Sequence, residues 1–170
     1  MNEVEKKKVD LHIKVRHTPK TVALSYVVEN IGINIRVGVP IKQKDEYKVP
    51  IYLPLSNGEK VTCGIITIDK NLKVKSAPDI NEVEEILQEA LKRRFSHTLH
   101  TFAINHSEIY TGTRSGEVVI IFKRIYGIAF DDIMKIAETY YYWISEIEAI
   151  NSFVCIHFTP SNNIVEDEDE

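Results

Sequence analysis

Hydrophobic residues recur at every second position along much of the first 41 residues. The segments 9–16, 22–28 and 31–41 all show this period of two. Because successive side chains of a strand point to opposite faces of a sheet, the pattern predicts three half-buried strands. Thr18-Pro19-Lys20 predicts a turn between the first two of them.

The segment 47–150 is predicted to lay down one unit twice, two strands joined by a polar turn and followed by an amphipathic helix. The first unit has strands at 49–55 and 61–69, a turn at 56–59 and a helix at 79–94. The second has strands at 98–110 and 117–125, a turn at 112–116 and a helix at 131–148. Asn57-Gly58 is a strong hairpin signal because both residues tolerate positive φ. A last strand is expected at 153–158.

These elements predict an α+β fold with a mainly antiparallel sheet of about seven or eight strands and two main helices. The chain has 170 residues, which fits one domain with a substantial core. We expect that domain to span residues 9–160. Residues 1–8 are expected to be flexible, and residues 161–170 to form a disordered acidic tail.

Composition excludes several classes of protein and leaves function open. The net charge of −4 argues against attraction to nucleic acid or anionic lipid over the whole surface. The N-terminus lacks the apolar stretch of a signal peptide, and no apolar run is long enough to cross a membrane. Cys63 and Cys155 are the only cysteines, and both lie in apolar runs typical of buried thiols. We therefore expect a cytoplasmic protein without a cofactor.

Four potential metal ligands, His97, His100, His106 and Glu108, lie within twelve residues. If 98–110 is a strand, positions 100 and 106 are about 20 Å apart, too far for one ion. Only His106 with Glu108 remains as a candidate pair, and surface histidines are the simpler interpretation. Cys155 and His157 share a strand face, which we interpret as a core cysteine beside an edge histidine. No catalytic residue is predicted.

Four consecutive aromatic residues, Tyr140 to Trp143, are the best clue to function. On the helix expected at 131–148 they would spread over about 300°, so they cannot all enter one core. Exposed tyrosine and tryptophan are enriched in protein interfaces. Tyr141, Tyr142 and Trp143 are therefore the predicted partner-binding residues of a non-enzymatic protein-binding or adaptor domain that self-associates or joins a larger assembly.

A second class of function stays open. Arg93 and Arg94 close the first helix, and Arg114 and Arg124 lie in the second hairpin. Together they would form a phosphate-binding patch beside His106 and Glu108. The alternative is therefore a nucleic-acid-associated protein or a small metal-dependent nuclease.

Overall fold

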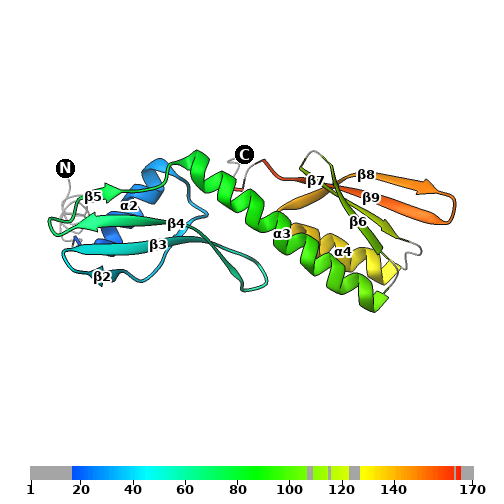
Figure 1. Cartoon of the computed structure of the whole chain (residues 1–170), viewed down its shortest axis with the longest axis horizontal. Coiled ribbons are helices and arrows are strands. Elements are labelled where there is room, and N and C mark those ends of the chain that lie inside the picture. The colour runs from blue at the N-terminus through cyan, green and yellow to red at the C-terminus, as the bar shows by residue number, and fades with distance from the viewer. Residues whose placement is uncertain (1–16, 107–108, 115, 123–126, 163, 166–170) are drawn as a thin grey trace, which may run out of the picture.

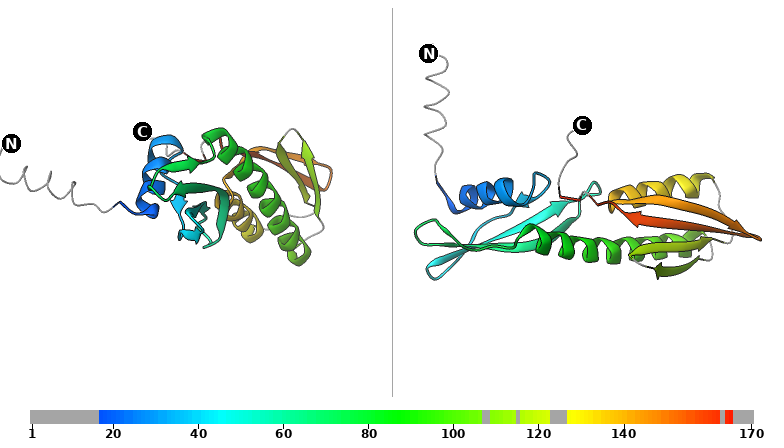
Figure 2. Two further views of the ribbon diagram at one scale, coloured as in Figure 1. Left: turned by 60° about the vertical axis from the view of Figure 1, so that its left-hand side comes forward. Right: turned by 90° about the horizontal axis from the view of Figure 1, so that it is seen from above.

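The structure is a computed structural model that describes residues 17–106, 109–114, 116–122, 127–162 and 164–165. The described chain is elongated, with a sheet at each end and one long helix running along both (Figure 1). Figure 2 shows the same arrangement from two further directions. We call the two ends the first and second lobes.

The first lobe contains a five-stranded antiparallel sheet and one helix. The helix is α2 (Pro19–Asn30). The strands are β1 (Arg36–Val37), β2 (Ile41–Gln43), β3 (Glu46–Pro54), β4 (Lys60–Asp69) and β5 (Val74–Ser76). They are ordered β1-β3-β4-β5, and β2 pairs with the remaining part of β3.

The second lobe contains a four-stranded antiparallel sheet and one helix. The helix is α4 (Gly127–Thr139). The strands are β6 (Ile109–Arg114), β7 (Glu117–Phe122), β8 (Tyr142–Ile150) and β9 (Phe153–Pro160), in the order β6-β7-β9-β8. The last two strands form a hairpin, which places β8 at the edge of the sheet.

The long helix α3 (Ile80–His106) joins the lobes through a buried stripe. The stripe consists of buried residues at every fourth position of α3, namely Val83, Leu87, Leu91, Phe95 and Leu99. Residues four apart lie on one face of an α-helix, so this spacing gives a continuous apolar seam. The Phe95 ring stacks on Tyr142 of β8 at 4.4 Å and meets Phe158 of β9 edge-on at 5.2 Å.

The α+β class and the antiparallel pairing are confirmed, and in the described part of the chain the strands divide between two sheets accompanied by three helices. The hairpin at residues 56–59 is also confirmed, since β3 and β4 pair antiparallel on either side of it. Gly58 there has φ of +89°. The order of a hairpin followed by a helix occurs twice, at β3–β4 before α3 and at β6–β7 before α4.

The strand expected at 22–28 is wrong, because this segment lies in α2. Thr18 caps the helix, and its side chain and backbone exchange hydrogen bonds with Thr21. Pro19 stands at the start, where its missing N–H costs nothing. Ala23 and Val27 are the buried residues, at helical spacing. These local signals outweigh the alternation of apolar residues.

The single long strand expected at 31–41 is also wrong, since only Arg36–Val37 and Ile41–Gln43 are in strands. Ile33, Val39 and Ile41 are exposed despite their regular spacing. Gly38 lies so close to β3 that a Cβ there would be 2.9 Å from the ring of Pro50. The Gly38 N–H donates to the Pro50 carbonyl oxygen at 2.8 Å, so this close approach continues the contact of β1 with β3 by one residue.

The helix expected at 79–94 begins where predicted, with the Asp79 carboxylate accepting a hydrogen bond from the Glu82 N–H at 2.8 Å. It continues to His106, so the strand expected at 98–110 is wrong over most of its length. Phe95 and Leu99 extend the buried stripe at helical spacing, and neither glycine nor proline interrupts the segment.

The helix expected at 131–148 ends at Thr139 in α4. Tyr141 has φ of +62°, a left-handed conformation that breaks the helix. The chain then enters β8, so the four aromatic residues do not share a helix. Their distribution over two faces comes from this turn and from the alternation of a strand.

Polar contacts tie the turn between β3 and β4 to the end of α4. The Tyr140 hydroxyl lies 3.0 Å from the Thr98 hydroxyl and 3.4 Å from the Glu59 carboxylate. Arg94 donates to the same carboxylate at 3.2 Å. A hairpin of the first lobe thus contacts the second lobe directly.

The chain returns from β9 toward the first lobe, as Figure 2 shows. Ile164 and Val165 are buried there, within the segment 161–170 that the sequence assigns to an acidic tail. A Cβ on Gly32 would be 2.6 Å from the Val165 carbonyl oxygen, so only glycine fits at that contact. The acidic residues 166–170 lie outside the described residues.

Candidate functional site on the open face of the second sheet

One face of the four-stranded sheet packs on α3 and α4, and the other faces outward. Ile156 and Phe158 of β9 are fully buried on the helix side, and Phe158 touches Phe95 of α3. Side chains alternate along a strand, so Cys155 and His157 lie on the outward side. Figure 1 shows the two helices on the same side of this sheet.

We define the open face by outward residues of three neighbouring strands, whose cross-strand pairing places them together. They are Glu117, Val119 and Ile121 of β7, Trp143, Glu146, Glu148 and Ile150 of β8, and Phe153, Cys155 and His157 of β9.

The open face is partly apolar. Trp143 is 56% exposed, Ile150 is 55% exposed and Phe153 is 36% exposed. Val119 and Ile121 are half-buried beside them. Exposed apolar groups collected on one surface are typical of an interaction site, whereas single ones are ordinary.

The open face is also acidic. Glu117, Glu146 and Glu148 are its carboxylates, and β7, β8 and β9 contain no lysine or arginine. His157 is the one side chain of these three strands that can carry a positive charge. Arg114 of the neighbouring β6 lies opposite Glu117. The part of the face around Glu146 and Glu148 is therefore the part that favours cations and basic groups.

A thiol, an imidazole and two carboxylates meet near the centre of this face. The Cys155 Sγ lies 3.6 Å from the His157 Nε2, and that nitrogen lies 3.3 Å from the Glu148 Oε2. The other ring nitrogen, Nδ1, is 3.9 Å from the Glu117 Oε2. The ligand atoms of Glu148, Cys155 and His157 all lie within 4.8 Å of one another.

The two cysteines differ in their surroundings. Burial raises the pKa of the Cys63 thiol to about 12, and this thiol lies in β4 of the first lobe. Burial also raises the pKa of Cys155, and the charges of Glu148 and Glu146 raise it further. Both shifts disfavour the thiolate, whereas a cysteine nucleophile requires a lowered pKa.

The predicted partner-binding residues are divided by the turn before β8. Trp143 lies on the open face, whereas Tyr142 is buried against Phe95 and Tyr141 is half-buried. Burial raises the pKa of Tyr142 to about 12. Of the three residues, Trp143 has the most exposed side chain.

The predicted metal and nucleic-acid residues do not gather at one described place. Glu108 and Arg124 lie outside the described residues, as do the side chains of His106 and Arg114. Arg94 is paired with Glu59. Arg93 borders two hollows on α3, of about 570 Å³ and about 700 Å³, that both include Glu89.

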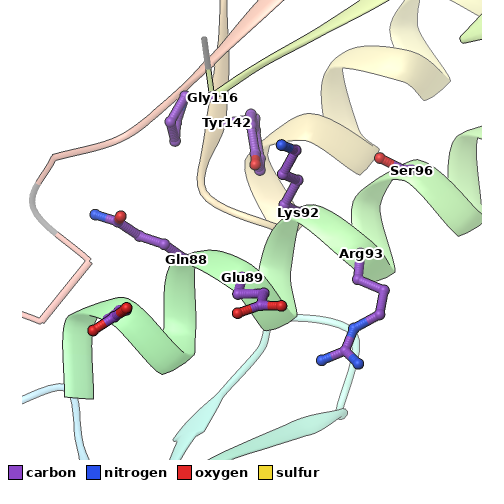
Figure 3. A pocket seen from close by; sticks show the side chains of 9 residues that line it. Gln88, Glu89, Lys92, Arg93, Ser96, Gly116 and Tyr142 are labelled. Atoms are coloured by element: carbon purple, nitrogen blue, oxygen red, sulfur yellow. The ribbon is translucent and has the colours of Figure 1, made fainter. Parts of the chain in front are cut away.

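The smaller hollow lies between α3, the turn before β7 and the start of β8. Figure 3 shows Lys92 directed toward Tyr142 and Gly116, whereas Glu89 and Arg93 lie on the other side of the helix. Glu85 and Gln88 also line it. Its charges are mixed, so this hollow does not form a concentrated basic patch.

Sequence analysis noted that Cys155 and His157 share a face, but it missed their neighbours. Glu146 and Glu148 were assigned to a helix, and Glu117 was not singled out. The available signal was the alternation of Ile144, Glu146, Glu148 and Ile150, which also fits a strand.

No protein-family model matches the chain, and neither the curated proteins nor the solved structures yielded a significant match to it. Within the part of the chain that the structure describes, no helix is both long and apolar enough to cross a membrane.

Proposed function

We propose that this protein is a non-enzymatic protein-binding domain whose open face receives an extended, basic and apolar segment of a partner protein. The observation that carries the proposal is the position of Trp143, which is more than half exposed on a sheet face that none of the described helices covers. Tryptophan in such a position is frequent among the residues that dominate binding energy.

Charge complementarity defines the partner segment. Three glutamates without lysine or arginine on β7–β9 favour a ligand that carries positive charge. The exposed Ile150 and Phe153 favour apolar side chains in the same ligand. Nucleic acid is disfavoured here, because its phosphates would face these carboxylates.

The edge of the sheet gives such a segment a place to pair. β8 is the last strand in the order β6-β7-β9-β8, so one side of its backbone has no strand partner among the described residues. An extended segment can add to such an edge through main-chain hydrogen bonds while its alternate side chains contact the open face.

The chain itself contains a segment with this chemistry, which supplies a probe. Residues 6–16 combine lysines and an arginine with alternating Val9, Leu11, Ile13 and Val15. A synthetic peptide of residues 6–16, with a fluorescent label, is titrated with the full-length protein. Trp143 is the single tryptophan, so its emission reports binding at this face directly.

We expect binding, a shift of Trp143 emission to shorter wavelength, and about tenfold weaker binding of the labelled peptide to Trp143→Ala. Ile65→Ala is the matched control, because Ile65 is 53% exposed on the first sheet. A peptide with glutamate in place of each lysine and arginine should not bind. The proposal is wrong if the peptide does not bind, or if the two variants bind it equally.

Light scattering of the full-length protein then shows whether the segment bound at the open face belongs to a second copy of this chain or to a different protein. A dimer that dissociates in Trp143→Ala would make a second copy the partner. A monomer that binds the peptide would point to a different protein. A complex with an oligonucleotide that weakens when Arg93 and Arg94 become Ala would instead support the nucleic-acid alternative.

A further inference from the structure

The geometry points to a zinc site on the open face, with Cys155, His157 and Glu148 as ligands and water in the fourth position. The inference does not depend on the proposed binding of a protein segment. It follows from the cross-strand pairing, the distances between ligand atoms and the charge of the surroundings.

Pairing between β8 and β9 brings the three ligands together. Cys155 and His157 are two residues apart on β9, so they point to the same side of the sheet. Glu148 stands directly opposite Cys155 on β8. Glu146 stands opposite His157 and adds a second carboxylate to the rim. Backbone hydrogen bonds of the hairpin thus hold the ligand-bearing positions in register.

The distances fit a tetrahedral ion. With Zn–S of about 2.3 Å and Zn–N and Zn–O of about 2.0 Å, tetrahedral geometry places sulfur and nitrogen about 3.5 Å apart and nitrogen and oxygen about 3.3 Å apart. The observed separations are 3.6 Å for Cys155 Sγ to His157 Nε2 and 3.3 Å for His157 Nε2 to Glu148 Oε2.

The sulfur and the carboxylate oxygen need to lie closer than the 4.8 Å that bounds the set. A rotation of the Glu148 side chain supplies this movement, since that side chain is exposed and Cys155 and His157 hold the more enclosed positions. The exposed carboxylate also leaves the ion a path from solvent.

A further carboxylate is placed to orient the imidazole. The Glu117 Oε2 lies 3.9 Å from the His157 Nδ1, on the opposite side of the ring from Cys155 and Glu148. A histidine that binds metal through one nitrogen commonly donates its other N–H to a carboxylate. A movement of about 1 Å would close that hydrogen bond. Glu117 is therefore a positioning residue.

The donor set selects the class of metal. Thiolate and imidazole favour zinc and its neighbours, whereas magnesium and calcium require oxygen ligands. Glu117, Glu146 and Glu148, with no lysine or arginine on β7–β9, leave negative charge that a divalent cation would neutralise. Coordination by Cys155 as thiolate releases its proton to solvent.

The test uses the full-length protein without a histidine tag, freed of metal by a chelator. Zinc affinity is measured by competition with a chromophoric chelator, and cobalt serves as a spectroscopic substitute. We expect one zinc ion per chain. Cobalt should give a near-ultraviolet thiolate-to-metal charge-transfer band and the intense visible bands of tetrahedral geometry.

Variants assign the ion to these residues. His157→Gln and Glu148→Gln should each weaken zinc binding by more than about 100-fold, and Cys155→Ser should abolish the charge-transfer band. Glu148 is exposed, so its variant keeps the fold even if the buried Cys155 variant does not. Glu117→Gln should weaken binding about 10–100-fold and keep the band. Glu46→Gln, on the other sheet, should change nothing.

Three results would overturn the assignment. They are a protein that retains no zinc against the competing chelator, a cobalt spectrum without the thiolate band, or affinity that is equal in His157→Gln and the unmodified chain. Trp143→Ala retains all three ligands, so zinc binding by this variant separates failure of the metal site from failure of the peptide-binding surface.

Discussion

The outward faces of the two sheets differ in how their charged side chains are paired. On the first sheet the carboxylate of Glu46 pairs with both Lys48 and Lys75. Lys60 lies over the ring of Tyr52, with its Nζ 4.8 Å from the ring centre. On the second sheet, three carboxylates face outward across β7–β9 without a lysine or arginine.

On the first sheet Glu46 is paired with two lysines, whereas Glu146 and Glu148 of the second sheet have no lysine or arginine opposite them on β9. Opposite charges placed across neighbouring strands stabilise a sheet, and like charges destabilise it. The first sheet has its own cations. On the second, Arg114 of β6 lies opposite Glu117. No lysine or arginine of β8 or β9, however, lies opposite Glu146 or Glu148. This local excess of carboxylates is the common basis of the proposed basic segment and the proposed zinc ion.

The largest expected change in the free energy of unfolding comes from a substitution in the core that the two lobes share. Phe95→Ala should cost about 3–5 kcal/mol, because Phe95 contacts Tyr142 and Phe158 within the buried stripe of α3. Urea unfolding followed by Trp143 fluorescence and by circular dichroism should show one shifted transition with both probes. Two separate transitions would show that the lobes unfold independently. Phe95→Leu should cost less.

The next effect concerns the first lobe alone. Gly32→Ala should cost about 1–3 kcal/mol, because the new Cβ would be 2.6 Å from the Val165 carbonyl oxygen and 2.8 Å from its Cγ1. The measurement is the urea midpoint. Val165→Ala in the same chain relieves only the Cγ1 contact, so the two changes should not be additive. Equal stability of Gly32→Ala and the unmodified chain would contradict this contact.

A smaller effect tests the polar contact between the lobes. Tyr140→Phe should cost about 0.5–1.5 kcal/mol, because its hydroxyl lies 3.0 Å from the Thr98 hydroxyl and 3.4 Å from the Glu59 carboxylate. Tyr26→Phe is the control, since the Tyr26 hydroxyl donates to Pro78 away from the second lobe. Hydrogen exchange of the β3–β4 turn should accelerate in Tyr140→Phe and stay unchanged in Tyr26→Phe.

The smallest expected effect is on the melting temperature, and it compares the outward faces of the two sheets by their dependence on pH. The hydrogen bond from Lys75 lowers the pKa of Glu46 below its ordinary value of 4.5. The folded state thus favours the carboxylate, so this contribution to stability is present above the ordinary pKa and is lost as pH falls through the lowered value. Glu46→Gln should reduce the melting temperature at neutral pH and cease to do so in acid.

Glu148→Gln gives the matching measurement on the second sheet. In metal-free protein at neutral pH it should not reduce the melting temperature, because it removes one of three neighbouring carboxylates. A reduction as large as that of Glu46→Gln would show that the two faces do not differ in their balance of charge.

The sequence predicted those parts of the fold whose local signals agree with their tertiary role. Asn57-Gly58 favours a tight turn whatever surrounds it, and buried residues alternate along the strand before it. The strand after it changes phase, since Ile65 is exposed and Ile66 is buried. Asp79 similarly marks the start of α3. In these places the backbone preference of a few residues decides the structure.

The predictions of secondary structure that were wrong concern short segments whose apolar residues fit both the period of a strand and the period of a helix. Residues 22–28 alternate like a strand, yet Ala23 and Val27 are the residues that the core selects. Residues 144–150 fit either element, and the left-handed Tyr141 decides between them. Because Glu148 was assigned to a helix, its pairing with Cys155 could not be anticipated. Trp143 was predicted to bind a partner for a reason that depended on the wrong element, and the structure shows only that its side chain is exposed.

The contact of Val165 with Gly32 has a consequence for synthesis. The ribosome releases the chain from its N-terminus, so α2 and the first sheet emerge well before residues 164 and 165. The core of the first lobe is complete only when those two residues arrive, because Ile164 and Val165 belong to it. The first lobe therefore cannot finish folding until residues 164 and 165 have left the ribosome, although α2 and the first sheet emerge long before them.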